Sequence, residues 1–239
     1  MKIITPLLGS VVAIALVLFM PLARANNGNM LTVVTVGDST VADYPLADPL
    51  RGWGQILNEY FKPSTKIVNV AICGRSTKTF FETGNWEKAL NTKPNFIFIQ
   101  FGHNDSHAKS QPESTDANTD YMVNLRRYVG EARKAQATPI LVTPPHRLIF
   151  DGNTGKLTQE LKPYAEAMKR VAEEMEVSVI DLYELSGETF EPMGEGGVAG
   201  MTATPQDRTH FTEKGARILA GLVAREAAKI DSRLQSALK

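Results

Sequence analysis

The chain has a single cysteine, Cys73, so no disulfide can form within it. Zinc fingers and paired redox cysteines are therefore excluded. An excess of either charge is also missing, because 26 basic residues balance 26 acidic ones and no long run of one sign occurs. This balance argues against nucleic acid or an anionic membrane surface as the main partner. We expect Cys73 to be a small, buried packing residue rather than a nucleophile.

Long hydrophobic runs are absent except at the start of the chain. Residues 1–25 combine a basic Lys2, an almost wholly apolar stretch from Leu7 to Leu22, and Ala23-Arg24-Ala25, which has the small-x-small form of a cleavage site. The apolar stretch is shorter than the roughly 18–20 residues that a membrane-spanning helix needs. We therefore expect a cleaved signal peptide rather than an uncleaved anchor. Residues 26–239 would then form one exported, monomeric domain, periplasmic or extracellular, without membrane contact.

Strand-like and helix-like segments alternate along the mature chain. The strand candidates are short, rich in Val and Ile, and mostly continuous in hydrophobicity, as suits strands covered on both faces: residues 31–36, 66–70, 95–101, 139–143 and 177–181. The helix candidates lie between and after them: residues 52–60, 80–90, 119–136, 161–175 and 212–228, the last with Thr212 as a plausible N-cap. The alternation predicts an α/β domain with a five-stranded parallel sheet and helices on both faces.

Three stretches fit no regular element and are predicted to be loops that build a site: residues 41–51, 106–118 and 188–209. Asp151-Gly152-Asn153 reads as a turn at the tip of a small hairpin.

A possible nucleophile and its base stand at opposite ends of this pattern. Ser39 follows the first predicted strand, at the sheet edge where parallel sheets form ligand crevices. A serine nucleophile needs a neutral imidazole to take its proton and an acid to orient that imidazole. Asp207 and His210, three residues apart in a predicted turn, offer both. On spacing alone, an Asp that caps the turn beside a half-exposed His explains the pair equally well.

Two further strand ends carry groups that would stabilise a developing oxyanion. Asn104, after the third predicted strand, has a side-chain amide to donate, and Gly74, after the second, lets a backbone N–H approach the substrate closely. The N–H of Ser39 is a third candidate. The plainer alternative is that Asn104 and Asp105 cap a loop. His103 and His107 flank Asp105 like metal ligands, but no further ligand has suitable spacing, so we expect no metal.

Taken in chain order, these blocks resemble the SGNH, or GDSL-like, hydrolase superfamily, and within it rhamnogalacturonan acetylesterases most. The matching blocks are Gly37-Asp38-Ser39-Thr40, Gly52-Trp53-Gly54, Gly74-Arg75-Ser76-Thr77, Phe101-Gly102-His103-Asn104-Asp105 and Asp207-Arg208-Thr209-His210-Phe211. Thr40 replaces the leucine of the lipase-like pattern, a departure that this esterase group shares. The resemblance implies a flavodoxin-like three-layer α/β/α sandwich. It also implies Ser39 as nucleophile, His210 as base, Asp207 as orienting acid, and an oxyanion hole of Ser39, Gly74 and Asn104, with no cofactor or metal.

The resemblance implies an exported serine esterase that removes O-acetyl groups from an acetylated polysaccharide or oligosaccharide, most closely rhamnogalacturonan of pectin. Tyr44, Trp53 and Trp86 offer faces for sugar rings, although Trp53 between two glycines more often packs. Arg75 and Arg147 are candidates to meet a uronic acid carboxylate, or else are ordinary salt-bridge partners. The alternatives are an acetylxylan esterase, a lysophospholipase-like esterase, and a glycan-binding module without turnover. A flavodoxin-like cofactor or phosphoacceptor domain is disfavoured, because no phosphate-binding loop or acidic pocket follows the first strand.

Overall fold

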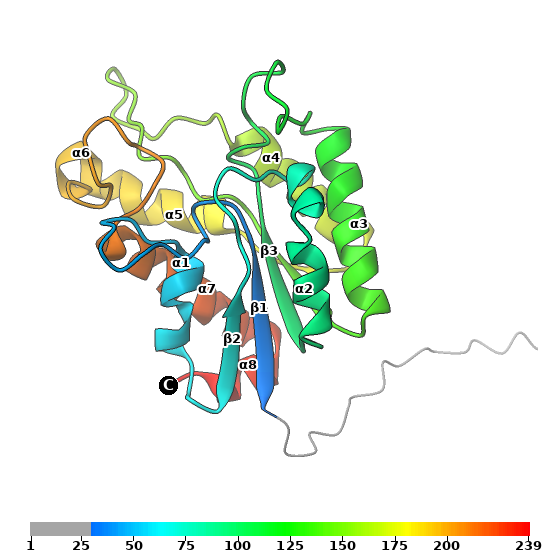
Figure 1. The fold of residues 1–239 in the computed structure, drawn as a ribbon. Helices are drawn as coiled ribbons and strands as arrows, with labels where there is room; N and C mark the ends of the chain where they lie inside the picture. Colours follow the sequence, from blue (N-terminus) through cyan, green and yellow to red (C-terminus); the bar gives the residue numbers. More distant parts are fainter. Residues whose placement is uncertain (1–29) are drawn as a thin grey trace, which may run out of the picture.

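A computed structural model describes residues 30–239, which form a five-stranded parallel sheet between two layers of helices (Figure 1). The strands run in the order β2-β1-β3-β4-β5. Their bounds are β1 Leu31–Gly37, β2 Thr65–Asn69, β3 Phe96–Gln100, β4 Thr138–Val142 and β5 Ser178–Ile180. All five predicted strands and the α/β/α architecture are therefore confirmed, and no strand bound differs from its predicted position by more than one residue.

Hydrophobic side chains project from both faces of the sheet into a core on each side. This explains why the strand sequences are continuous apolar runs. All five residues of β3 are buried. Phe96 and Phe98 enter one core, while Ile97 and Ile99 enter the other. Each such side chain contributes about 1.5–3 kcal/mol when it is fully buried. The two cores fix the sheet between its helical layers.

Helices from different parts of the chain cover the two faces. One core contains side chains of α2 (Asn85–Asn91), α3 (Asp120–Lys134) and α4 (Lys162–Glu174). The other contains side chains of α1 (Trp53–Ile56), α5 (Leu182–Phe190), α7 (Glu213–Ile230) and α8 (Ser232–Ala237). Figure 1 shows α2 and α3 on one side of the sheet, and α1, α7 and α8 on the other.

The predicted helices are found, but two of them are divided. The first consists of α1 followed by the 3-10 helix η1 (Leu57–Tyr60), and the second of η2 (Thr79–Thr83) followed by α2. Thr212 does precede α7, but its hydroxyl donates to the carbonyl of Gly200 at 2.7 Å. The loop predicted at residues 188–209 is wrong over residues 188–197, which hold the end of α5, the 3-10 helix η3 (Glu191–Met193) and α6 (Gly194–Gly197).

The strand order brings three of the predicted site segments to one edge. β1 lies between β2 and β3, and all three run in the same direction, so the segments that follow them leave from the same edge. The hairpin predicted at Asp151 is present as an antiparallel bridge between Phe150 and Leu157. Within residues 30–239 no helix is both long and apolar enough to cross a membrane. The predicted signal peptide, residues 1–25, lies outside the described residues.

Candidate active site

Ser39 stands in a tight turn directly after β1. The carbonyl of Asp38 accepts hydrogen bonds from the backbone N–H groups of Val41 and Ala42 at 3.1 and 3.0 Å. The Asp38 carboxylate accepts the N–H of Thr40 at 2.9 Å, which closes the turn from inside. The turn leaves Ser39 at the carboxyl edge of the sheet with only a small part of its surface exposed.

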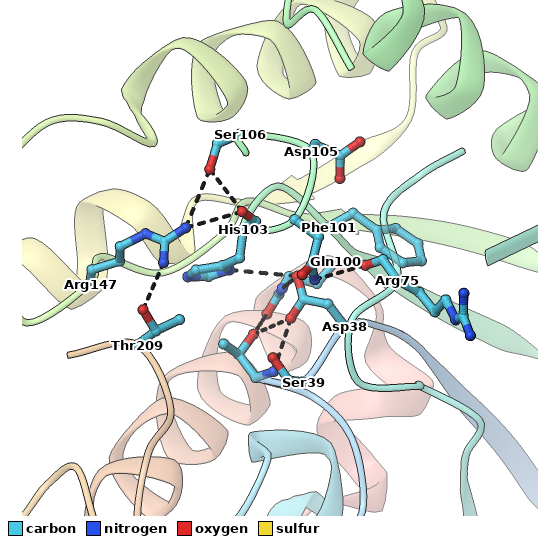
Figure 2. Close-up of polar contacts among 12 residues, drawn as sticks. Asp38, Ser39, Arg75, Gln100, Phe101, His103, Asp105, Ser106, Arg147 and Thr209 are labelled. Atoms are coloured by element: carbon cyan, nitrogen blue, oxygen red, sulfur yellow. Dashed lines mark hydrogen bonds and ion pairs between the residues drawn. The ribbon is translucent and has the colours of Figure 1, made fainter. Parts of the chain in front are cut away.

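Buried polar side chains contact Asp38 and stabilise this turn. Asp38 is fully buried, and burial alone would raise the pKa of its carboxyl, but contacts with His103 and Thr40 keep that pKa below its ordinary value. The Nδ1 atom of His103 lies 3.6 Å from Asp38 Oδ2 (Figure 2). Gln100, at the end of β3, donates to the same carboxylate oxygen at 3.3 Å and accepts the indole N–H of Trp53 at 2.8 Å. Sequence reasoning missed Gln100, whose signal is an amide at the end of an otherwise apolar strand.

His210 joins the serine to an acid. Its Nε2 atom lies 2.9 Å from Ser39 Oγ, and its Nδ1 atom lies 3.0 Å from Asp207 Oδ2. Burial raises the pKa of Asp207, but hydrogen bonds from the N–H groups of His210 and Thr209 and the His210 ring bring that pKa below its ordinary value. An ionised Asp207 accepts a proton-bearing Nδ1, so that the Nε2 lone pair faces the serine hydroxyl. The structure thus brings together all three residues of the predicted triad.

The two predicted oxyanion donors follow the neighbouring strands. Gly74 has φ of +74°, a conformation that glycine adopts without strain, and the position of its missing Cβ is open space. The Asn104 side-chain amide donates to the carbonyl of Arg75 at 3.0 Å. That bond orients the amide and uses one of its two hydrogens, so the second is free to donate to a ligand.

Asp105 connects the two segments that carry these donors. Its buried carboxylate accepts the N–H of Thr77 at 3.1 Å and the hydroxyl of Thr115 at 2.8 Å, and it also accepts the Thr77 hydroxyl. Burial raises the pKa of Asp105 to about 7, against the opposing effect of these hydrogen bonds. The predicted alternative, an acid that caps a loop, therefore describes Asp105 in part, since it ties the Gly74 segment to the Asn104 segment.

Two of the three residues predicted to bind substrate, Tyr44 and Arg147, hydrogen-bond to the protein itself. The Tyr44 hydroxyl donates to the carbonyl of Ser39 at 2.9 Å, and burial raises the pKa of this phenol. The Arg147 guanidinium donates to three protein acceptors rather than facing solvent. The Arg75 side chain points away from Ser39 (Figure 2). Arg147 Nε also lies 3.7 Å from Glu160 Oε1, which fits the alternative that Arg147 is a salt-bridge partner.

Trp53 is buried and its indole N–H donates to Gln100, so it packs, as its place between two glycines favoured. The expectation that Trp86 offers a face to a sugar is wrong, because Trp86 is buried and its indole N–H donates to Glu131. Cys73 is exposed rather than buried, because β2 ends at Asn69 and Cys73 lies beyond the sheet.

The two histidines that flank Asp105 in the sequence do not lie in a cluster of metal-ligating side chains among the residues that the structure describes. Within residues 30–239 no group of three or more His, Cys, Asp and Glu side chains is placed to hold an ion. His107 Nδ1 instead lies 2.6 Å from Glu113 Oε1, and His103 is buried beside Asp38. In the arrangement of Ser39, His210 and Asp207, the imidazole is placed to take the hydroxyl proton and so to activate the nucleophile.

Comparisons with known proteins identify relatives of this chain. The sequence profile described as GDSL-like Lipase/Acylhydrolase family matches residues 35–218. The chain is 37% identical to the probable rhamnogalacturonan acetylesterase YesY of Bacillus subtilis, over 81% of this chain and 90% of that protein. It is 34% identical to the rhamnogalacturonan acetylesterase RhgT of the same organism, over 81% and 88%.

A solved structure extends the likeness to three dimensions. The crystal structure of the Bacillus subtilis protein YxiM superposes with a TM-score of 0.72 at 27% identity. The match covers 83% of this chain and 56% of that one, so this chain spans little more than half the length of YxiM.

Proposed function

This chain belongs to the GDSL-like Lipase/Acylhydrolase family and is a carboxylic ester hydrolase, and from that premise we propose that it removes O-acetyl groups from rhamnogalacturonan. The observation that carries the proposal is the hydrogen-bonded chain from Ser39 Oγ through His210 to Asp207. Similarity to two rhamnogalacturonan acetylesterases over most of the chain supports the choice of polysaccharide.

The reaction begins with attack of the Ser39 hydroxyl on the carbonyl carbon of the acetyl ester. His210 Nε2 takes the hydroxyl proton as the new bond forms, and Asp207 stays ionised and stabilises the imidazolium. The C–O bond to the sugar then breaks, and the sugar oxygen leaves with the proton from His210. The product bound to the enzyme is an acetyl ester of Ser39.

Hydrolysis of that ester repeats the same proton transfers. His210 takes a proton from a water molecule that attacks the acetyl carbonyl, and returns it to Ser39 Oγ as acetate leaves. In both steps the carbonyl oxygen becomes negative. The N–H groups of Ser39 and Gly74 and the free hydrogen of the Asn104 amide would stabilise it, and loss of one such donor typically costs about 10²–10³ in rate.

An acetate-release assay tests the proposal. The substrates are acetylated rhamnogalacturonan, acetylated xylan and a long-chain acyl ester, with Ser39→Ala as the matched control. We expect the first substrate to have the highest kcat/KM, and Ser39→Ala to lose more than about 10⁴-fold, because nucleophile and base act as a unit.

Each alternative gives a different result in this assay. Preference for acetylated xylan would identify an acetylxylan esterase, and preference for the long-chain ester a lysophospholipase-like enzyme. Binding of the polysaccharide without any acetate release would identify a glycan-binding module. Full activity of Ser39→Ala would refute the mechanism whatever the substrate.

Export is part of the proposal and rests on residues 1–25. Their basic start, apolar stretch and Ala23-Arg24-Ala25 site are those of a secretory signal. N-terminal sequencing of protein from the periplasm and the medium should give a chain that starts near Asn26. An intact N-terminus on protein held in the membrane fraction would contradict export in soluble form.

A further inference from the structure

The Arg147 guanidinium lies between two loops of the site (Figure 2). Its Nη1 atom donates to the hydroxyl of Thr209 at 2.7 Å. Its Nη2 atom donates to the carbonyl of His103 at 3.0 Å and to the hydroxyl of Ser106 at 3.3 Å. Ser106 itself donates to the His103 carbonyl at 2.8 Å, so the acceptors on this side form one hydrogen-bonded group.

These acceptors are neighbours of the groups that do the chemistry. Thr209 directly precedes His210, whose Nε2 faces Ser39. In the sequence, His103 directly precedes Asn104 and Ser106 follows it by two residues, and the Asn104 amide is a candidate oxyanion donor. One guanidinium therefore bridges the loop of the base and the loop of the oxyanion donor. The next residue adds a second contact, because Leu148 N–H donates to the carbonyl of Arg208 at 2.7 Å.

The surroundings of Arg147 differ from those of an ordinary surface salt bridge. Only 16% of its side chain is exposed, and its nearest carboxylate oxygen among the described residues, Glu160 Oε1, lies 3.7 Å from Nε. Burial lowers the pKa of this guanidinium, although Glu160, Asp38 and Asp207 oppose that effect. Glu160 thus lies near the outer limit of ion-pair distance, and a mostly buried ion pair of imperfect geometry contributes little net stability. The ion pair alone is therefore a poor explanation for the burial of Arg147.

We propose that Arg147 is a positioning residue that fixes His210 relative to Asn104, an inference that rests on the proposed esterase function. A guanidinium suits this task because its donors lie in one rigid plane and point to two sides at fixed distances. Attack on an ester needs base and oxyanion donors in place together, and a displacement of about 1 Å can cost about 10²-fold in rate. Arg147 acts through these two groups and need not touch the substrate.

Kinetics of Arg147→Met test the proposal, because methionine keeps the apolar stem and removes the donors. We expect kcat to fall about 10²-fold with KM changed less than about threefold. Arg147→Lys should recover only part of the loss, since one ammonium cannot serve both loops in the same geometry. Arg133→Met is the matched control. Arg133, near the end of α3, likewise donates hydrogen bonds to another segment, the carbonyls of Met175 and Glu176, but at the opposite edge of the sheet from the site.

A double-mutant cycle separates positioning from general loss of structure. If Arg147 acts through Asn104, then Arg147→Met should cost at least fivefold less in an Asn104→Ala background than in the wild type. Thr209→Val removes only the hydrogen bond from Arg147 to the loop that carries His210, and it should lower kcat by about tenfold. This variant also tests the inference if Arg147→Met fails to fold.

Several results would overturn the inference and leave the proposed function intact. The first is a folded Arg147→Met that keeps the full wild-type kcat, and the second is an equal loss of kcat in Arg133→Met and Arg147→Met. The third is an additive effect of Arg147→Met and Asn104→Ala on kcat. In each case Ser39→Ala must remain inactive. For an Arg147→Met that does not fold, an unchanged kcat in Thr209→Val overturns it. Retained activity of Ser39→Ala would instead remove the proposed function.

Discussion

Replacing Asp105 with asparagine should flatten the pH dependence of stability between about pH 4 and pH 7. Burial raises the pKa of the Asp105 carboxyl from about 3.8 to about 7, although hydrogen bonds from Thr77 and Thr115 favour the ionised form. In that range the folded chain therefore holds a proton that the unfolded chain has released.

The sign and size follow from this difference in bound protons. A raised pKa means that the stability from this group is complete below about pH 4 and is lost as the pH rises through about 7. Each pH unit in which only the folded chain holds the proton changes the free energy of unfolding by about 1.4 kcal/mol. Summed over the whole interval, the change is about 4 kcal/mol. Asparagine resembles the protonated acid in shape and does not titrate.

Urea unfolding at pH 5 and pH 8 measures this effect. From pH 5 to pH 8 the wild type should lose about 3 kcal/mol of stability relative to Asp105→Asn. The loss accumulates over the roughly two pH units between pH 5 and the pKa of about 7, at about 1.4 kcal/mol for each unit. Asp151→Asn is the control: Asp151 is fully exposed, and hydrogen bonds from Thr154 and Asn153 lower its pKa, so it does not titrate in this range. If the wild type keeps or gains stability relative to Asp105→Asn between pH 5 and pH 8, the reasoning is refuted. That result would show that the hydrogen bonds to Asp105 affect its pKa more than burial does.

Two smaller predictions concern the same loops. Asn104→Ala should lower kcat by about 10²–10³ with little change in thermal stability, because it removes an oxyanion donor; an unchanged kcat would exclude Asn104 from the oxyanion hole. Gly102→Ala should lower the stability by about 1–3 kcal/mol, because a Cβ would lie 2.6 Å from Pro144 Cγ at φ of +145°. Gly152→Ala, where a Cβ meets nothing within 4 Å, is the control, and equal melting temperatures of the two variants would contradict this prediction.

The sheet was predictable because its strands are buried on both faces and read as continuous apolar runs. The helix α5 was not, although its start carries a signal: Asp181 accepts the N–H of Glu184 and caps it. Because Asp181 was assigned as the last residue of the predicted strand 177–181, its role as the N-cap of α5 was not recognised. Gly187 within the helix is a weak helix former. Its inward face is held by tertiary packing, through the buried Leu182, Ser186 and Phe190 at intervals of four.

The candidate site divides in the same way between local and tertiary information. Ser39, Asn104 and Gly74 follow adjacent parallel strands, so strand order alone brings them to one edge. The acceptors of Arg147 lie 44, 41 and 62 residues away in the sequence. The direction of a long, flexible side chain depends on all of them at once. Sequence alone therefore identified Arg147 as an available cation, and the fold determined which groups it binds.

Thr40 illustrates how a residue can indicate a substrate without touching it. In the sequence it separates this chain from the lipase-like pattern, which has leucine at that position. In the structure Thr40 is 1% exposed, and its hydroxyl lies 2.8 Å from Asp38 Oδ1 and 3.0 Å from Gln100 Oε1. Its side chain thus supports the nucleophile turn from below, where no sugar can reach it. Selection among ester substrates must act through exposed residues around Ser39, and substitutions there, rather than at Thr40, are the ones expected to change the preferred substrate.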